Sequence, residues 1–279
     1  MTTARADLAA RRLLVTGAAS GIGRRVVGDL DARGARVLAA DLTREALDAA
    51  SSQDGWSERV EPVAFDVRDP DGWDAAIARG VDLWGGLDVV LNVAGWLRPS
   101  EVHEASDDDI HRVFDVNVKG VTFGLRAAAR HMIERGAGGH IVNIASLASL
   151  APIPGISLYS ASKYAVRALS LAAAAELREH DIAVSVVCPD AVRTPMLDLQ
   201  LDYPQAALTF TAPRFLEAAD VSRVILDRVL PRRPLLVALP RRRALLARFA
   251  DLFPRAQQLI SSLLRRQGLK RQRAMRRGE

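Results

Sequence analysis

The sequence predicts an α/β fold in which one doubly wound parallel sheet of about seven strands has helices on both faces. Two observations carry this prediction. Short apolar runs recur without the alternation typical of half-exposed strands, and helical stretches separate them. The chain has 279 residues, 49% of them hydrophobic, which is enough to bury a large core. No internal repeat is visible, so solenoids and propellers are excluded.

The expected elements follow a regular order. The first strand leads into a glycine-rich turn and a helix that ends at Gly34, and Thr43 is a candidate cap for the second helix. After Pro195 the pattern changes to a segment rich in Leu and Phe, expected to form a loop or short helices. The expected strands are residues 12–15, 36–40, 60–65, 87–93, 140–144, 182–187 and 235–239, and the expected helices are 24–33, 43–51, 71–81, 106–135, 158–179 and 217–230.

The composition excludes several classes of protein. Cys188 is the only cysteine, which excludes an intrachain disulfide and a cysteine-based zinc site. The five histidines lack metal-binding spacing. Residues 1–12 lack the apolar stretch of a secretory signal, and the longest apolar runs have about five residues, whereas a membrane span needs about 20. We therefore expect a reduced, metal-free cytoplasmic protein.

Positive charge is concentrated at the C-terminus. Residues 232–279 contain thirteen arginines and Lys270 against Asp251 and Glu279, a net charge of +12, and since the whole chain carries +5 the remainder carries −7. We expect one α/β domain over residues 1–240 and a basic extension over residues 241–279. The extension is expected to form two amphipathic helices separated by Pro254, with its last dozen residues, 268–279, disordered.

The role of this extension has three interpretations. The helices cover the body of the protein or a neighbouring subunit, they make peripheral contact with an anionic membrane surface, or they attract nucleic acid non-specifically. Few aromatic residues and no recognition motif argue against the third, so no specific nucleic-acid partner is expected. We favour the first interpretation and keep membrane contact as the second.

A glycine-rich turn follows the first expected strand. Gly17 permits a tight turn, and Gly21 and Gly23 allow a pyrophosphate to approach backbone N–H groups at a helix N-terminus. Asp41, 18 residues after Gly23, ends the second strand, where a carboxylate accepts hydrogen bonds from an adenosine ribose. Alternatively, Asp41 is a strand-end residue that caps the next helix. The turn and its setting predict a Rossmann-type dinucleotide site.

Together with Tyr159-Ser160-Ala161-Ser162-Lys163, this turn resembles the short-chain dehydrogenase/reductase family over about residues 10–240. Asn117, Ser146, Tyr159 and Lys163 match the family's catalytic tetrad. The sequence departs from the family pattern at Val93, where a second Asn is usual, and at Asp190, where Gly is usual and a side chain tolerates positive φ less well. By resemblance, the cofactor-binding residues are Gly17, Ser20, Gly21, Ile22, Gly23, Asp41, Leu42, Asp66, Val67, Asn92, Ala94, Gly95, Tyr159, Lys163, Pro189, Val192 and Thr194.

The tetrad residues suit the oxidation of an alcohol. A base must take the hydroxyl proton, but tyrosine with its usual pKa of about 10 is a weak base at neutral pH. Lys163 lies one helical turn after Tyr159, so its ammonium is expected to lower the pKa of the phenol. Ser146 is expected to donate to the substrate oxygen. The resemblance implies that Asn117 holds a water in a proton relay and that Lys163 also holds the nicotinamide ribose.

The charge near Asp41 favours NAD over NADP. Asp41 would repel a 2′-phosphate, and the positions where NADP-preferring relatives carry a basic residue are occupied by Ala19, Ser20 and Leu42. Arg44 could turn inward, although a solvated helix position suits it better.

Three apolar segments are expected to line the substrate site: residues 96–97, 150–156 and a lid at about 195–216. They suggest a lipophilic alcohol, but packing against one another or against a subunit explains them equally well. We therefore expect an NAD-dependent oxidoreductase that interconverts a secondary, lipophilic alcohol and its ketone, as a homodimer or homotetramer. The alternatives are a reductase of acyl-carrier-bound ketoesters and a non-catalytic NAD-binding regulator.

Overall fold

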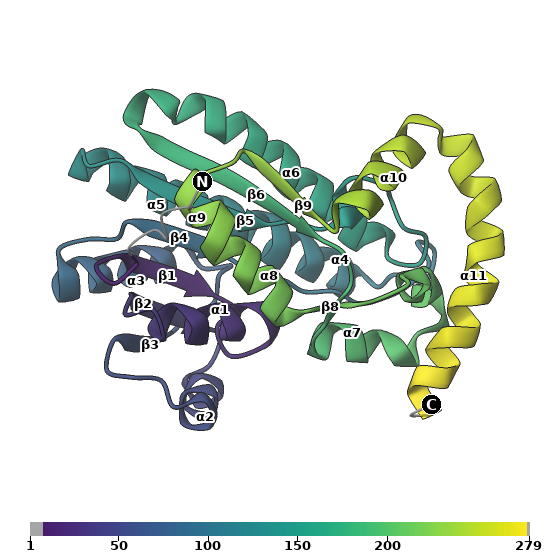
Figure 1. Cartoon of the computed structure of the whole chain (residues 1–279), viewed down its shortest axis with the longest axis horizontal. Coiled ribbons are helices and arrows are strands. Elements are labelled where there is room, and N and C mark those ends of the chain that lie inside the picture. The colour runs from purple at the N-terminus through teal and green to yellow at the C-terminus, as the bar shows by residue number, and fades with distance from the viewer. Residues whose placement is uncertain (1–7, 278–279) are drawn as a thin grey trace, which may run out of the picture.

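A seven-stranded parallel sheet forms the centre of the molecule (Figure 1). The computed structural model describes residues 8–277. The strand order is β3-β2-β1-β4-β5-β6-β9. Every neighbouring pair in the sheet is parallel. The strands are β1 (Arg12–Thr16), β2 (Arg36–Asp41), β3 (Val60–Ala64), β4 (Val89–Asn92), β5 (Gly139–Ile144), β6 (Ile182–Pro189) and β9 (Leu236–Leu239). The predicted doubly wound sheet is confirmed.

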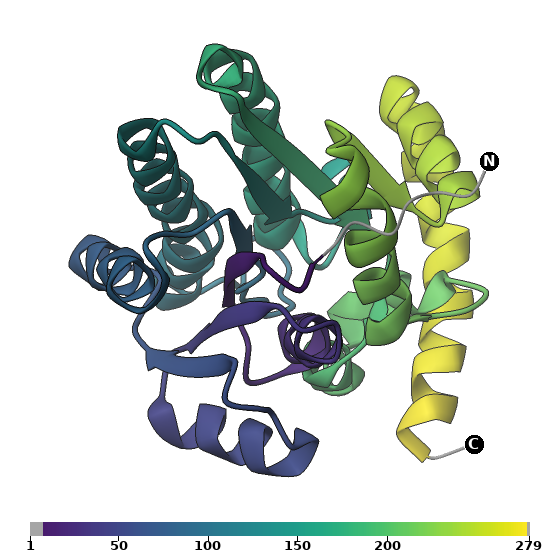
Figure 2. The same cartoon turned by 60° about the vertical axis from the view of Figure 1, so that its left-hand side comes forward.

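Helices cover both faces of this sheet (Figure 2). Those before the C-terminal region are α1 (Gly21–Asp31), α2 (Arg44–Asp54), α3 (Pro70–Trp84), α4 (Asp107–Phe114), the π-helical turn η1 (Asp115–Gly120), α5 (Val121–Arg135) and α6 (Ser157–Glu176), with short 3₁₀ turns η2 (Leu147–Ser149) and η3 (Arg178–His180).

Successive residues of each strand pack against different layers. In β1, Leu13 and Val15 lie in one apolar cluster with Leu30 of α1, whereas Leu14 lies in the other cluster with Trp73 of α3. Both faces of the strand are therefore buried, which explains why the strands read as continuous apolar runs.

The cofactor end of the sheet lies where the strand order reverses, between β1 and β4. Thr16, the last residue of β1, joins the ends of β1 and β4, because its hydroxyl accepts hydrogen bonds from Val93 N at 3.0 Å and Ala94 N at 3.1 Å. The turn after β1 and the loop after β4 are thus held side by side. In open α/β sheets, ligands bind in the crevice outside the carboxyl ends of the strands at such a reversal.

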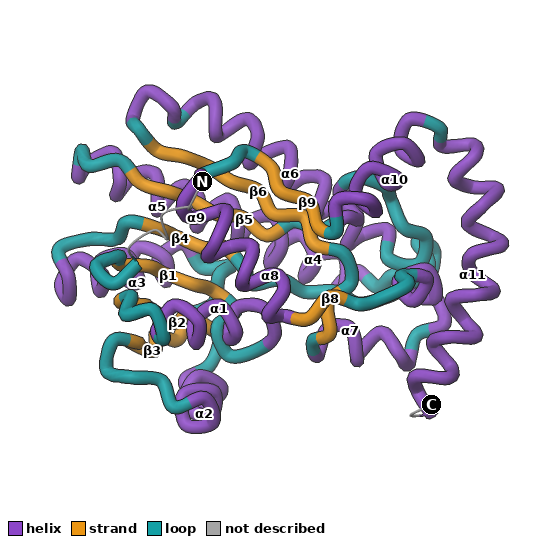
Figure 3. Tube along the Cα trace, viewed as in Figure 1, coloured by secondary structure: helices purple, strands orange, loops and turns teal. Residues whose placement is uncertain are grey.

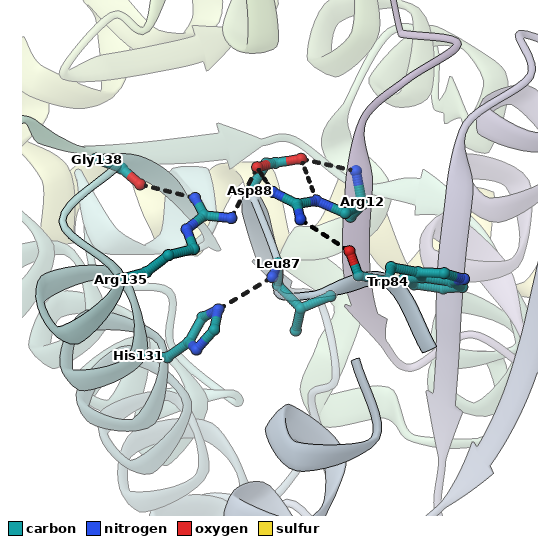
Figure 4. Close-up of polar contacts among 7 residues, drawn as sticks. All are labelled: Arg12, Trp84, Leu87, Asp88, His131, Arg135 and Gly138. Carbon is teal, nitrogen blue, oxygen red and sulfur yellow. Dashed lines mark hydrogen bonds and ion pairs between the residues drawn. The ribbon is translucent and has the colours of Figure 1, made fainter. Parts of the chain in front are cut away.

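An ion-pair network lies at the opposite, N-terminal ends of the central strands β1 and β4 (Figure 4). Asp88, just before β4, accepts hydrogen bonds from Arg12 N at 3.0 Å and Arg12 Nη2 at 2.6 Å, and from Arg135 Nη1 at 2.9 Å. Burial alone would raise the pKa of Asp88, but the hydrogen bonds from Arg12 and Arg135 outweigh it and lower the pKa to about 2. The network ties β1 and the end of α5 to β4.

Most of the C-terminal region lies beside the carboxyl ends of the strands, whereas residues 218–230 pack against α1 on one face of the sheet (Figure 3). It comprises a two-stranded parallel pair, β7 (Val192–Arg193) and β8 (Leu216–Glu217), and the helical segments α7 (Pro195–Leu199), η4 (Gln200–Asp202), η5 (Pro204–Thr211), α8 (Ala218–Val224), η6 (Ile225–Val229), α9 (Leu230–Arg232), α10 (Arg241–Leu252) and α11 (Pro254–Arg277). The helix expected over residues 217–230 contains a π-helical turn, η6, at its centre.

The expected disorder of residues 268–279 was wrong as far as the structure describes them, since α11 continues to Arg277. Residues 278–279 lie outside the described part. Gly268 lies close against the backbone of Ala207, because a Cβ at Gly268 would be 2.0 Å from the Ala207 oxygen. The buried Gln272 amide donates to Gln200 O at 2.7 Å and to Tyr203 O at 2.8 Å. These contacts order the last turns, which the charge of the tail alone does not reveal.

Pro254 separates α10 from α11, as expected. Across residues 8–277, no helix combines the length and the apolar character needed to span a bilayer.

Candidate active site

The turn after β1 is shaped by its glycines. Gly17 has φ +69° and Gly21 has φ +52°, a backbone region that favours glycine. At Gly23 a Cβ would lie 2.1 Å from Gly17 O, so the start of α1 approaches the turn too closely for any side chain. The turn therefore leaves room for a phosphate group to reach the N-terminus of α1.

A cavity of about 280 Å³ lies over this turn and the ends of β2, β3 and β4. Its glycine-lined floor suits the phosphates of a dinucleotide. The expected cofactor residues that line it are Gly17, Ser20, Gly21, Ile22, Gly23, Asp41, Leu42, Asp66, Val67, Ala94, Gly95 and Thr194.

The Asp41 carboxylate is fixed at the end of β2. One oxygen accepts a hydrogen bond from Ala19 N at 2.8 Å, and the other accepts one from Leu42 N at 2.7 Å. The cap of α2 is Thr43, whose hydroxyl accepts from Ala46 N at 3.3 Å. Asp41 is therefore not the side-chain cap of this helix, and its carboxylate lines the cavity.

Two arginines of this cavity had no place in the sequence interpretation. Arg68 pairs with Asp66 at 2.6 Å, and this contact lowers the pKa of the Asp66 carboxyl despite its partial burial. The Arg112 guanidinium lies 5.2 Å from the centre of the Trp96 ring. Arg68 could have been expected here because it lies two residues after Asp66 in the sequence. Arg112 comes from α4, far from the other cavity residues in sequence, so no local pattern indicated it.

The four tetrad residues lie close together. Ser146, Tyr159 and Lys163 line a second cavity of about 130 Å³, which adjoins the first through Gly95 and Thr194. Ser146 follows β5, and its hydroxyl accepts from Ala148 N at 3.1 Å. Both other residues lie on α6, with Lys163 Nζ 5.5 Å from the centre of the Tyr159 ring. Lys163 Nζ donates to Ile144 O at 2.9 Å, which anchors it at the end of β5.

Burial governs the proton affinity of this pair. It raises the pKa of Tyr159 to about 12, although a hydrogen bond with Ser146 acts in the opposite direction. Burial also lowers the pKa of Lys163 to about 8. Burial therefore dominates the pKa of both groups, and the expectation that Lys163 lowers the pKa of the phenol stays a prediction.

Asn117 lies in the π-helical turn η1 between α4 and α5. Its side chain is fully buried, accepts from Trp96 N at 2.7 Å and donates to Trp96 O and Ser162 Oγ, both at 2.9 Å. A Cβ at Gly95 would lie 3.5 Å from both Asn117 Oδ1 and Lys163 Nζ, so these two groups flank Gly95. π-Helical turns within α-helices are frequent at functional sites.

Asn92 lies apart from both cavities. Its amide donates to Asn143 Oδ1 at 2.7 Å, and the Asn143 amide donates to Ser170 Oγ at 2.9 Å. This buried chain of hydrogen bonds joins β4, β5 and α6, so the side chain of Asn92 supports the sheet. Pro189 and Val192, expected to bind the cofactor, line the catalytic cavity rather than the cavity over the glycine turn, and their role in cofactor binding stays a prediction.

The comparisons with known proteins agree with this geometry. The family model described as short chain dehydrogenase matches residues 11–202. The chain belongs to the short-chain dehydrogenase family. Its activity is that of a dehydrogenase acting on hydroxyl groups, and the family uses NAD or NADP.

Relatives of this short-chain dehydrogenase oxidise different alcohols. The chain is 40% identical over 200 residues to 2-(R)-hydroxypropyl-CoM dehydrogenase of Xanthobacter autotrophicus, covering 70% of this chain and 80% of that one. It is 34% identical over 212 residues to 3-alpha-(or 20-beta)-hydroxysteroid dehydrogenase of Mycobacterium tuberculosis, covering 76% of this chain and 79% of that one. A short-chain dehydrogenase from Mycobacterium paratuberculosis, crystallised bound to NAD, superposes with TM-score 0.73 at 29% identity over 83% of this chain and 97% of that one.

The family match ends before the basic extension, yet the extension reaches the catalytic cavity of this short-chain dehydrogenase. Arg243 of α10 forms an ion pair with Asp190, and both residues line that cavity. Burial raises the pKa of Asp190, and Arg243 opposes the rise. Among the described residues, the positive φ values outside glycine are at Asp181 and Arg233, so Asp190 has no backbone strain of the kind expected. Asp190, which stands where the family usually has Gly, is thus paired with a residue of α10.

Proposed function

We propose that this short-chain dehydrogenase is an NAD-dependent enzyme that interconverts a secondary, lipophilic alcohol and its ketone, with Tyr159 as the general base. The observation that carries the proposal is the convergence of Ser146, Tyr159 and Lys163 in one cavity next to the glycine turn. Bound NAD would supply the acceptor for the hydride that leaves the carbinol carbon.

Each tetrad residue has one role in this proposal. Tyr159 takes the hydroxyl proton during oxidation and returns it to the carbonyl oxygen during reduction. Ser146 donates a hydrogen bond to the substrate oxygen and orients it. Lys163, anchored on Ile144 O, stabilises the phenolate, and Asn117 positions the groups through which the proton leaves. Burial raises the pKa of Tyr159 to about 12 in the protein alone, so positive charge close to the phenol is what would make it an efficient base.

Asp41 supports NAD as the preferred cofactor. Its carboxylate lies in the cofactor cavity and would repel a 2′-phosphate. Arg44 is turned toward Asp48, with Nε 2.8 Å from the carboxylate, which leaves Asp41 without that basic neighbour. The NAD bound to the M. paratuberculosis relative is consistent with this preference.

The lining of the catalytic cavity supports a lipophilic substrate. Besides the tetrad residues, the walls carry Leu97, Leu147, Ile153, Ile156, Leu197 and Leu208. Apolar walls with a few convergent polar groups are typical of small-molecule sites. The hydroxysteroid dehydrogenases among the relatives act on lipophilic secondary alcohols, which agrees with this lining.

A turnover assay with NAD and NADP against lipophilic and small polar alcohols tests this proposal. NAD-linked oxidation of a lipophilic secondary alcohol would support it. Tight NAD binding without turnover across the panel would favour the non-catalytic regulator. A parallel assay that showed NADPH-linked reduction of an acyl-carrier ketoester would favour the other alternative. Peripheral membrane contact, oligomeric state and cytoplasmic location stay predictions.

A further inference from the structure

A third cavity, of about 290 Å³, lies between the basic extension and the loop that precedes α6. We call it the extension chamber. Small residues of α10, Ala247 and Ala250, leave space on its wall, and Gln257 of α11, also in its lining, donates to Pro152 O at 2.7 Å. Its lining is mainly apolar: Leu147, Ala151, Pro152, Ile153, Pro154, Leu208, Leu246, Ala247, Ala250, Ile260 and Leu264.

The extension chamber adjoins the catalytic cavity. The two share Leu147, Ile153, Asp190, Leu208 and Arg243 in their walls. The catalytic cavity alone, at about 130 Å³, is smaller than the about 300–1,000 Å³ usual for ligand pockets, whereas both together reach this range. A substrate that fills the combined space would therefore extend from Tyr159 into the chamber.

The charges at the junction determine which chemistry would pass it. Asp190 and Arg243 lie there as an ion pair, so the negative and positive charges compensate each other. Such a junction offers no net attraction to an anionic group, and the walls beyond it favour hydrocarbon. The chamber therefore suits an apolar chain rather than a carboxylate or phosphate.

Contacts to the body hold the chamber in place. Three residues of α11 bind the body. Arg265 pairs with Glu101 at 3.0 Å, Arg276 pairs with Asp202 at 3.1 Å, and the Gln272 amide donates to Gln200 O. The helix α11 is thus fastened to the body at several points along its length. The packing keeps α11 next to α10 without filling the space between them.

We propose that the extension chamber binds the hydrocarbon chain of the substrate while its secondary alcohol lies at Tyr159. This inference rests on the proposed alcohol dehydrogenase activity and narrows its substrate to an alcohol with an extended aliphatic chain. The basic extension is then part of the substrate site.

A series of 2-alkanols, from butan-2-ol to dodecan-2-ol, tests the inference with the full chain and NAD. Each added methylene that enters the chamber should raise kcat/KM by about threefold to fourfold, until the chamber is full. A flat dependence on chain length with measurable turnover would overturn the chamber and leave the proposed function standing. Absence of turnover with every alcohol, combined with no binding of dodecan-2-one to the NADH complex in a calorimetric titration, would contradict both.

Two variants fill the chamber from opposite walls, Ala250→Trp on α10 and Ile260→Trp on α11. Each should reduce the ratio of kcat/KM for decan-2-ol to that for butan-2-ol by at least about tenfold. The matched controls are Leu245→Trp and Leu263→Trp, whose side chains are 70% and 71% exposed and do not line the chamber. An unchanged ratio in both folded chamber variants, judged by circular dichroism, would overturn the proposal.

Discussion

The carboxylate of Asp190, directly after β6, forms an ion pair with the guanidinium of Arg243 in α10. The pair joins the catalytic domain to the basic extension at the wall of the substrate cavity. The side chain of Asp190 is 11% exposed, so its charge depends on Arg243 for compensation. The C-terminal extension is therefore part of the folded unit that surrounds the site.

Removing Arg243 should leave an uncompensated buried carboxylate. We expect Arg243→Ala to lower the free energy of unfolding by about 2–4 kcal/mol in urea denaturation. The control Arg242→Ala changes the neighbouring exposed arginine and should stay within about 0.5 kcal/mol of the wild type. The double variant Asp190→Asn with Arg243→Ala should recover part of the loss. Equal stability of Arg243→Ala and Arg242→Ala would mean that the pair contributes nothing.

Replacing Asp41 should change cofactor selectivity. Asp41→Ala removes the carboxylate expected to accept from the ribose, so the ratio of Kd for NADP to Kd for NAD should fall by at least about tenfold. Fluorescence titration of the free enzyme with the reduced forms, NADPH and NADH, measures the corresponding ratio of Kd values. Arg44→Ala is the control, because Arg44 pairs with Asp48 on the surface. An equal change of the ratio in both variants would show that Asp41 does not bind the ribose.

A side chain at Gly23 should prevent cofactor binding. The Cβ of Gly23→Ala would meet Gly17 O at 2.1 Å, so the turn must shift away from its position under the cofactor cavity. We expect NADH affinity to fall by more than about tenfold. Gly28→Ala, on the same helix with no heavy atom within 4 Å of its Cβ, should keep NADH affinity and add about 0.5–1 kcal/mol to stability. Wild-type affinity in Gly23→Ala would contradict the close approach.

The Asp88 network should make stability depend on acid pH. The pKa of Asp88 in the folded protein, about 2, lies below its ordinary value of 3.8, so the contribution is present above about pH 4 and disappears as pH falls through about 2. Because solvent screens part of the network, we expect Asp88→Asn to cost about 1–2 kcal/mol at pH 7. Denaturation of both proteins from pH 7 to pH 2 should show this difference shrinking. A difference that is constant down to pH 2 would contradict the account.

The sheet could be predicted from sequence because its pattern is local. Each strand is an apolar run bounded by turns or helix caps, and parallel pairing follows from the helices between runs. Thr43 is such a cap, whereas Gly34, expected to end α1, lies in the turn after its C-cap Ala32. The tetrad residues were picked out by the resemblance to the family, and the four-residue spacing of Tyr159 and Lys163 places both on one face of α6. The glycine turn has a geometry that few other residues adopt.

Properties that depend on distant residues could not be predicted. The partner of Asp190 lies 53 positions later in the chain, and the order of residues 268–277 depends on contacts with residues 200–211. The pKa of Tyr159 is governed by burial, which the spacing to Lys163 does not reveal. Asn92 matches a cofactor motif, yet its hydrogen bond to Asn143 across two strands directs the side chain into the sheet.

The most direct test of the central claim is single-turnover oxidation of a secondary alcohol by Tyr159→Phe, with NADH affinity measured in parallel. Phe keeps the ring but has no hydroxyl to take the proton, so the rate should fall by at least about 10³-fold while the Kd for NADH stays within about threefold. A rate near that of the wild type would show that Tyr159 is not the base and would contradict the proposed chemistry.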